Sequence, residues 1–346
     1  MTSKERLQTM VRGGAIDRVA VSGWMHMPLV DHNVHDFVKA TINLTDYCGF
    51  DFIKVMTNGN FMPEAYGADL TPSRDPHEWC CTFHRYPLQS ANDVAKIQVL
   101  DAKSGSLRRE VEAVKMLADH YQGDMPILAT IFNPITSIQE MMSCLDPTTV
   151  QEMMRTRKEE LHTGLKAVSR TIKNYLDELI TAGIDGIFLA NQYSMASIIT
   201  PEQYDEFCRP YDIDILKYIE GRTWFNMLHV HGDAGLLFDH CIDYPVEAFN
   251  WENVPSGADP STWTSIAKVR SMTDKILISG IDQEHDFYNR ENDRAAIKRV
   301  LKKRLEDALK DCPANKFIFA PGCSMPLDVD KYIYTIIREV AEEYPL

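Results

Sequence analysis

Two histidines and a distant cysteine are the residues of this sequence best suited to bind a metal ion together. His229 and His231 end one apolar run, and Cys323 follows another. Residues i and i+2 of an extended segment point to the same side, so both imidazoles can face one ion. With a thiolate they make three ligands typical of zinc, and the fourth tetrahedral position stays open, as in catalytic sites. The alternative interpretation is two ordinary histidines and a cysteine that packs as a small apolar residue.

Further polar and aromatic side chains follow the other apolar runs. In a barrel of parallel strands, the residues after the C-terminal ends of the strands form the active site. We therefore expect a substrate site lined by Trp24, His26, Asn58, Asn133, Asn191, Asn250 and Asp282. Ordinary polar loop composition is the alternative explanation for each of them. Cys80 and Cys81 lack such a strand end, and we interpret them as part of a loop.

The elements that position these residues alternate along the chain. Eight short runs rich in Val, Ile, Leu and Phe are the candidate strands: 19–22, 51–55, 126–131, 186–190, 224–230, 246–250, 276–279 and 317–320. Their nearly continuous apolar character is typical of parallel strands that are covered on both faces. Helical patterns separate them, such as the leucine-rich stripe before Gly183 and the stripe Tyr204, Phe207, Tyr211 and Ile215 after the capping residues Thr200 to Gln203.

This alternation predicts the α/β class and a (β/α)₈ TIM barrel in one domain, residues 1–346. A long insertion, roughly residues 60–125, separates its second and third strands. A doubly wound open sheet is the alternative architecture. Against it, no G-x-G-x-x-G or G-x-x-x-x-G-K-[ST] loop follows any of the strands.

Composition excludes several classes of partner. The net charge of −14 argues against binding to nucleic acid, which needs a basic surface. Eight cysteines without a C-x-x-C pair are typical of reduced thiols in a cytoplasm. The charged N-terminus does not resemble a signal peptide, and no apolar run is long enough to span a membrane. We therefore expect a cytoplasmic protein.

Motifs along nearly the whole chain resemble the uroporphyrinogen decarboxylase superfamily, which includes zinc-dependent corrinoid:thiol methyltransferases. The most specific are GIDGIFLANQ at 183–192, ITPEQYDEFCRPY at 199–211, HVHGD at 229–233 and PGCSMP at 321–326. The resemblance implies the barrel fold. In the methyltransferase branch, a His-x-Cys pair and a later Cys bind zinc, so the resemblance implies a similar zinc site here. His229 and Cys323 match that set, and His231 stands where the branch has its first Cys.

The decarboxylase branch fits the sequence less well. Its arginine-rich segment after the first strand is missing, since no arginine lies between Arg18 and Arg74, and Asn58 stands where that branch has an Asp. We therefore expect a methyltransferase that moves a methyl group between a corrinoid, such as methylcobalamin, and a thiol at a Zn²⁺ ion. The expected partners are a small-molecule thiol, a corrinoid protein and a second copy of the chain in a homodimer. A decarboxylase of a pyrrole or other carboxylated substrate, and a protein that only binds a ligand, are the alternatives.

Overall fold

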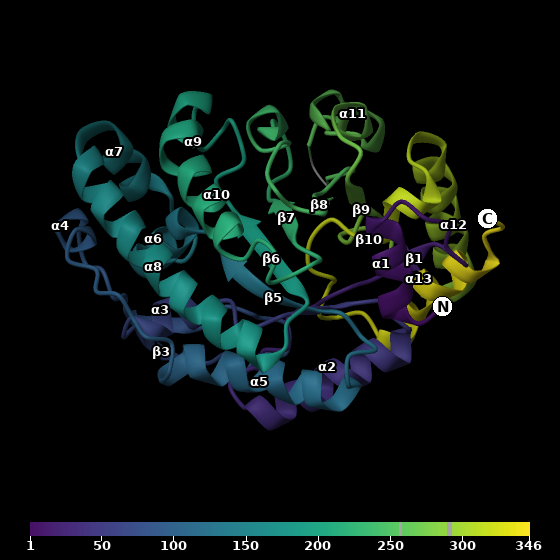
Figure 1. Cartoon of the computed structure of the whole chain (residues 1–346), viewed down its shortest axis with the longest axis horizontal. Helices are drawn as coiled ribbons and strands as arrows, with labels where there is room; N and C mark the ends of the chain where they lie inside the picture. Colours follow the sequence, from purple (N-terminus) through teal and green to yellow (C-terminus); the bar gives the residue numbers. More distant parts are fainter. Residues whose placement is uncertain (256–257, 289–292) are drawn as a thin grey trace.

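Eight parallel strands form one curled sheet at the centre of the molecule (Figure 1). The computed structural model describes residues 1–255, 258–288 and 293–346. The strands follow the order β1-β10-β9-β8-β7-β6-β5-β2. Their bounds are β1 Ala20–Val21, β2 Ile53–Val55, β5 Ile127–Phe132, β6 Gly186–Asn191, β7 Met227–Val230, β8 Ala248–Asn250, β9 Ile276–Ile281 and β10 Phe317–Pro321. Each lies within or overlaps one of the eight predicted runs, so the predicted barrel is confirmed.

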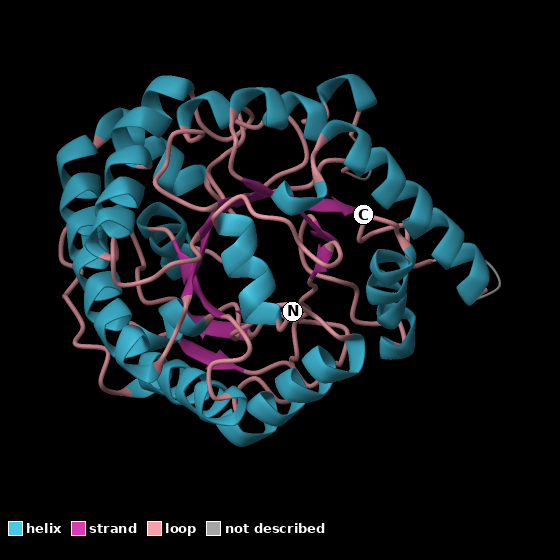
Figure 2. Ribbon diagram, turned by 45° about the vertical axis from the view of Figure 1, so that its right-hand side comes forward, coloured by secondary structure: helices cyan, strands magenta, loops and turns pink. Residues whose placement is uncertain are grey.

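Helices surround the sheet (Figure 2). The bounds are α1 Ser3–Val11, α2 Val34–Cys48, α3 Phe61–Ala65, α4 Ala91–Val94, α5 Gly105–Tyr121, α6 Pro134–Met142, α7 Thr148–Thr156, α8 Lys158–Ala182, α9 Pro201–Phe207, α10 Arg209–Tyr218, α11 Ile266–Met272, α12 Arg294–Asp311 and α13 Lys331–Glu343. Gly183 ends α8 in the left-handed conformation, as its position predicts. Within the described part of the chain, no helix is both long and apolar enough to cross a membrane.

Strand alternation divides the core into two layers. Along β10, Phe317 and Phe319 pack in the large cluster that includes the helices, whereas Ile318 and Ala320 belong to a smaller cluster. The smaller cluster fills the barrel, and it includes Leu7 and Met10 of α1. Alternate residues of a strand therefore face either the helices or the barrel interior, and only the second set can reach the centre of the barrel.

The chain between β2 and β5 holds the predicted insertion. It contains α3, a two-stranded antiparallel hairpin of β3 Asp69–Thr71 and β4 Thr82–Arg85, α4, and then α5. Because α5 packs between α2 and α8 in the outer layer, the last part of the predicted insertion is an ordinary barrel helix. The apolar stripe after Thr200, which suggested one helix, forms two helices, α9 and α10. The chain turns at Cys208 between them, and Pro210 has no N–H to donate within a continuous helix.

The sheet closes without a β-ladder between its first and last strands. Within residues 1–255, 258–288 and 293–346, β1 pairs only with β10, and β2 pairs only with β5. Asp51 bridges the gap instead, since its backbone N–H donates to Val21 O (2.8 Å) and its carboxylate accepts from the Val21 N–H (2.8 Å). The guanidinium groups of Arg6 and Arg18 also donate to this carboxylate, at 2.7 and 2.6 Å. We call this ionic closure the β1–β2 joint.

Candidate metal centre

His229 lies inside the barrel because of its register in the sheet. It pairs with Ala190 of β6 and Asn250 of β8, and Ala190 belongs to the cluster inside the barrel. The His229 side chain therefore points inward, where its ring stacks on Phe188 with the centroids 5.0 Å apart. His231 lies two residues further on and reaches the same side, as the spacing predicts.

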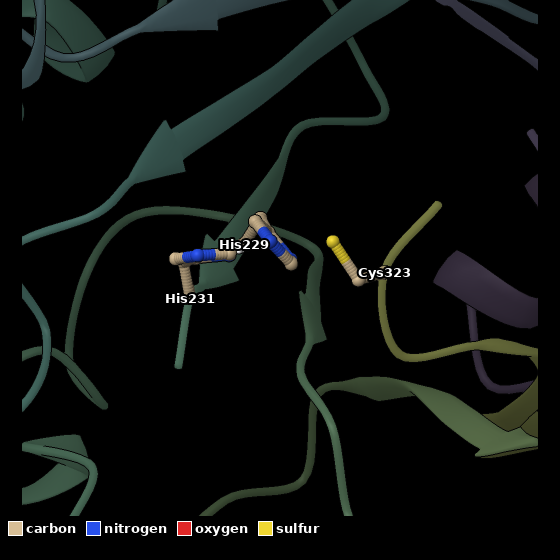
Figure 3. A group of neighbouring side chains, drawn as sticks. All are labelled: His229, His231 and Cys323. Atoms are coloured by element: carbon tan, nitrogen blue, oxygen red, sulfur yellow. Dashed lines mark hydrogen bonds between the residues drawn. The ribbon is translucent and has the colours of Figure 1, made fainter. Parts of the chain in front are cut away.

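These two histidines and Cys323 converge on one point (Figure 3). The Nδ1, Nε2 and Sγ atoms that they offer lie within 4.8 Å of one another, and His229 Nε2 is 3.2 Å from His231 Nδ1. Among the residues that the structure describes, no other group of three His, Cys, Asp or Glu side chains comes so close together. All three border a cavity of about 760 Å³, so the open side of the group faces space for a substrate.

Asn250 fixes the tautomer of His229. Its amide Nδ2 donates to Ile278 O (2.9 Å) and Pro321 O (3.1 Å), so its Oδ1 must face the imidazole. His229 Nδ1 then donates to Oδ1 at 2.6 Å, which leaves the Nε2 lone pair directed at His231 and Cys323. A metal-ligating histidine characteristically donates its other N–H in this way.

Burial keeps both imidazoles ready to bind a cation. It lowers the pKa of His229 and also that of His231, so both rings are neutral at pH 7. Neutral imidazole is the form that ligates a metal. Two imidazole nitrogens and one sulfur form a donor set that would suit a metal ion such as zinc, and all three residues border the cavity.

The loop after β10 brings Cys323 into this group. Gly322 precedes it, and a Cβ at that position would lie 2.5 Å from Glu252 Cα, so the close approach of the two backbones requires glycine. The Cys323 N–H donates to Gln283 Oε1 at 3.3 Å. Gln283 is buried after β9, and its role in supporting the Cys323 loop was not predicted from the sequence.

Two of the expected substrate residues border the cavity. Trp24 is buried against Phe52 and Phe188, and His26 stacks on Trp79 with the ring centroids 4.9 Å apart. Burial lowers the pKa of His26 to about 3, so this imidazole is neutral. Asn250 acts on the site indirectly, through His229.

Asn133 and Asn191 face away from the cavity, into the layer between sheet and helices. They donate to Asp212 of α10 at 3.0 and 2.9 Å, and Tyr244 donates to the same carboxylate at 3.2 Å. The reason is strand parity, because Asn191 pairs with Val230, which belongs to the outer cluster. The neighbours Phe132, Ala190 and Gln192 border the cavity in their place.

Asn58 and Asp282 also lie outside the cavity lining. Asn58 lies 2.8 Å from His32 Nε2 and 3.6 Å from Cys81 Sγ, beneath the insertion. Asp282 caps the turn after β9 by accepting from the backbone N–H groups of Glu284 (3.0 Å) and His285 (3.2 Å). Short polar side chains at strand ends often bind nearby backbone in this way.

Two buried ionisable residues in the cavity wall are not among the residues predicted from the sequence. Lys54 of β2 points inward, with its ammonium 4.7 Å from the centre of the Phe188 ring, and burial lowers its pKa to about 7. Glu140 of α6 borders the same cavity. The sequence contains an indication of both residues, because a lysine interrupts the apolar run 51–55 and a glutamate lies among the apolar residues of 134–142.

The adjacent cysteines lie in the loop before β4, as expected. Cys80 Sγ is 3.2 Å from Cys144 Sγ, and Asn60 contacts both sulfur atoms. Cys144 borders the cavity, so the loop that carries Cys80 packs against the cavity wall.

Replacing Asn250 tests how much the fixed tautomer contributes. Asn250→Ala removes the acceptor for His229 Nδ1, so we expect zinc affinity to fall about 10-fold to 100-fold, the range found when such partners are removed. Competition with a chelating dye measures this affinity. Asn133→Ala makes the same chemical change at another strand end and should leave zinc affinity unchanged. Equal affinities in the two variants would contradict the role of Asn250.

Comparisons with known proteins agree with this architecture. The uroporphyrinogen decarboxylase (URO-D) family model matches residues 3–344. The uroporphyrinogen decarboxylase of a Sulfurovum species is 24% identical over 194 residues, which is 55% of this chain and 54% of that protein, so the match spans about half of its length. The methylcobamide:CoM methyltransferase MtaA of Methanosarcina barkeri is 20% identical over 267 residues, 72% of this chain and 76% of that protein.

Among solved structures, a methyltransferase from Methanosarcina mazei has the same fold. The TM-score is 0.79 at 17% sequence identity, and the superposition covers 99% of both chains. The family match spans nearly all of the sequence. This chain belongs to the uroporphyrinogen decarboxylase (URO-D) family of enzymes.

Proposed function

We propose that this protein is a zinc-dependent methyltransferase that moves a methyl group between a corrinoid and a thiol. The observation that carries the proposal is the convergence of His229, His231 and Cys323 at the cavity wall. The similarity to methylcobamide:CoM methyltransferase MtaA supports it. We further propose one domain over residues 1–346, a corrinoid protein as methyl donor or carrier, a homodimer and a cytoplasmic location.

The residues around the cavity have separate tasks in this proposal. When bound, zinc lets a thiol lose its proton and become nucleophilic at neutral pH. His229, His231 and Cys323 would hold the ion, and Asn250 keeps the His229 ring in place. Trp24, Phe132 and Phe188 give the cavity apolar walls that exclude water from the thiol.

A decarboxylase is the second candidate, because the family model and several relatives carry that description. Lys54, which has no carboxylate partner among the described residues, borders the cavity and could bind a substrate carboxylate there. The geometry of Asn58 opposes the pyrrole chemistry, since this residue binds His32 and the neighbouring backbone rather than facing the cavity.

Metal content and turnover decide between the candidates. Protein purified without added metal should contain close to one zinc per chain, and His229→Ala should lose it. The zinc-containing protein should methylate 2-mercaptoethanol from methylcobalamin, and it should not release CO₂ from uroporphyrinogen. Less than about 0.2 zinc per chain, equal in wild type and His229→Ala, would refute the methyltransferase proposal. Ligand binding without any turnover would instead indicate a binding protein.

A further inference from the structure

Glu140 is a buried carboxylate that lacks a cationic partner in the described part of the chain. Its side chain is 3% exposed, and its Oε2 atom makes no hydrogen bond. The residue lies on α6 and borders the cavity that the metal centre faces. Burial raises the pKa of this carboxyl well above its ordinary value, and a cationic group that entered the cavity would stabilise its ionised form.

The cavity wall carries one basic and one acidic side chain with different neighbours, Lys54 beside the metal group (the metal pole) and Glu140 beside Cys144 (the Glu140 pole). Lys54 interacts electrostatically with Cys323, at the metal pole, whereas the electrostatic neighbour of Glu140 is Cys144. Lys54 Nζ donates to Met56 Sδ, and among the described residues no carboxylate pairs with it. A ligand with a positive group is therefore repelled at the metal pole and attracted at the Glu140 pole, which would orient it in one direction.

The walls of the cavity also suit a cation. Trp24, Trp79 and Phe132 border it, and aromatic rings attract an ammonium group through their electron-rich faces. An ammonium group is attracted by the carboxylate and by the aromatic rings, whereas a neutral hydroxyl group lacks both of these charge interactions. This distinguishes an amine from an alcohol as the preferred ligand.

We propose that Glu140 binds an ammonium group, and that the thiol substrate of this cavity is an aminothiol. The identification of the substrate as a thiol rests on the proposed methyltransferase function, whereas the ammonium site rests on Glu140 and the aromatic rings of the cavity wall. The thiol would lie at the metal pole and the ammonium group at Glu140.

Binding to a series of thiols tests the proposal. The probes are aminoalkanethiols with spacers of two to six methylene groups, with hydroxyalkanethiols and plain alkanethiols of equal length, and calorimetry with zinc-loaded protein gives each Kd. At one spacer length the aminothiol should bind about tenfold more tightly than both analogues. Glu140→Gln should abolish that preference without weakening the binding of the plain thiol.

Asp328→Asn is the matched control variant. Asp328 also borders the cavity, but it is exposed and already accepts a hydrogen bond from Tyr288. The aminothiol preference should survive in this variant. Equal affinity for the three probes at every length, or a preference that Glu140→Gln leaves intact, would overturn the aminothiol assignment.

A second measurement separates this inference from the proposed function. Alkylammonium ions without a thiol should bind wild-type protein in the presence of a zinc chelator, and Glu140→Gln should bind them about tenfold more weakly. If they bind in this way but no thiol binds the zinc-loaded protein, the ammonium site stands and the methyltransferase proposal fails. If thiols bind the zinc-loaded protein and alkylammonium ions do not bind, the ammonium site is refuted and the methyltransferase proposal stands.

Discussion

Cys323→Ser is expected to lose its zinc while it keeps its fold. The substitution replaces a thiolate ligand with a hydroxyl of similar size, and Cys323 is only partly buried, so packing changes little. Zinc affinity should fall by orders of magnitude. The melting midpoint should fall only by the contribution of the bound ion, as mass action requires. Zinc analysis and melting curves with and without a chelator measure both quantities.

Cys144→Ser provides the matched control, since Cys144 borders the same cavity outside the metal group. A chelator should lower the melting midpoint of wild type and Cys144→Ser, but not that of Cys323→Ser. Equal chelator sensitivity in all three proteins would show that Cys323 does not bind the metal.

Asp51→Asn should produce the largest loss of stability among the polar substitutions considered. Asp51 is fully buried and accepts from Arg6 and Arg18, which are themselves buried. Without the carboxylate charge, two buried cations lose their shared partner. Breaking such an arrangement costs about 3 to 5 kcal/mol of unfolding free energy. Urea unfolding followed by circular dichroism measures the difference.

Asp17→Asn is the comparison for Asp51→Asn. Asp17 also binds Arg6, at 2.7 Å, but its side chain is 39% exposed. An ion pair that solvent reaches contributes about 0 to 1 kcal/mol. If both variants lose the same stability, the β1–β2 joint is not held by its buried charge.

The sequence predicts the strands well because a parallel barrel buries each strand on both faces. The run 186–190 illustrates this, since every residue of β6 is buried. The metal group could be predicted for a local reason, because His229 and His231 share one face at i and i+2. Helix α9 begins at Pro201 after a capping box at Thr200, as the local residues indicate.

Other features depend on tertiary structure that local patterns do not encode. Whether Asn191 faces inward or outward follows from its pairing with Val230, and a shift of one residue reverses it. The pairing of His229 with Asn250 depends on the register between β7 and β8. Glu140 could not be predicted as a cavity residue, because its position depends on how α6 packs against the barrel.

The β1–β2 joint also determines what holds each wall of the cavity. In the strand order, the joint lies diametrically across the ring from the β7 and β8 pair, which carries His229 and Asn250. The strands at the joint lead to Trp24 and contain Lys54, both at the cavity wall. The placement of these two residues therefore depends on the buried ion pairs of Asp51, whereas the placement of His229 depends on a ladder of backbone hydrogen bonds.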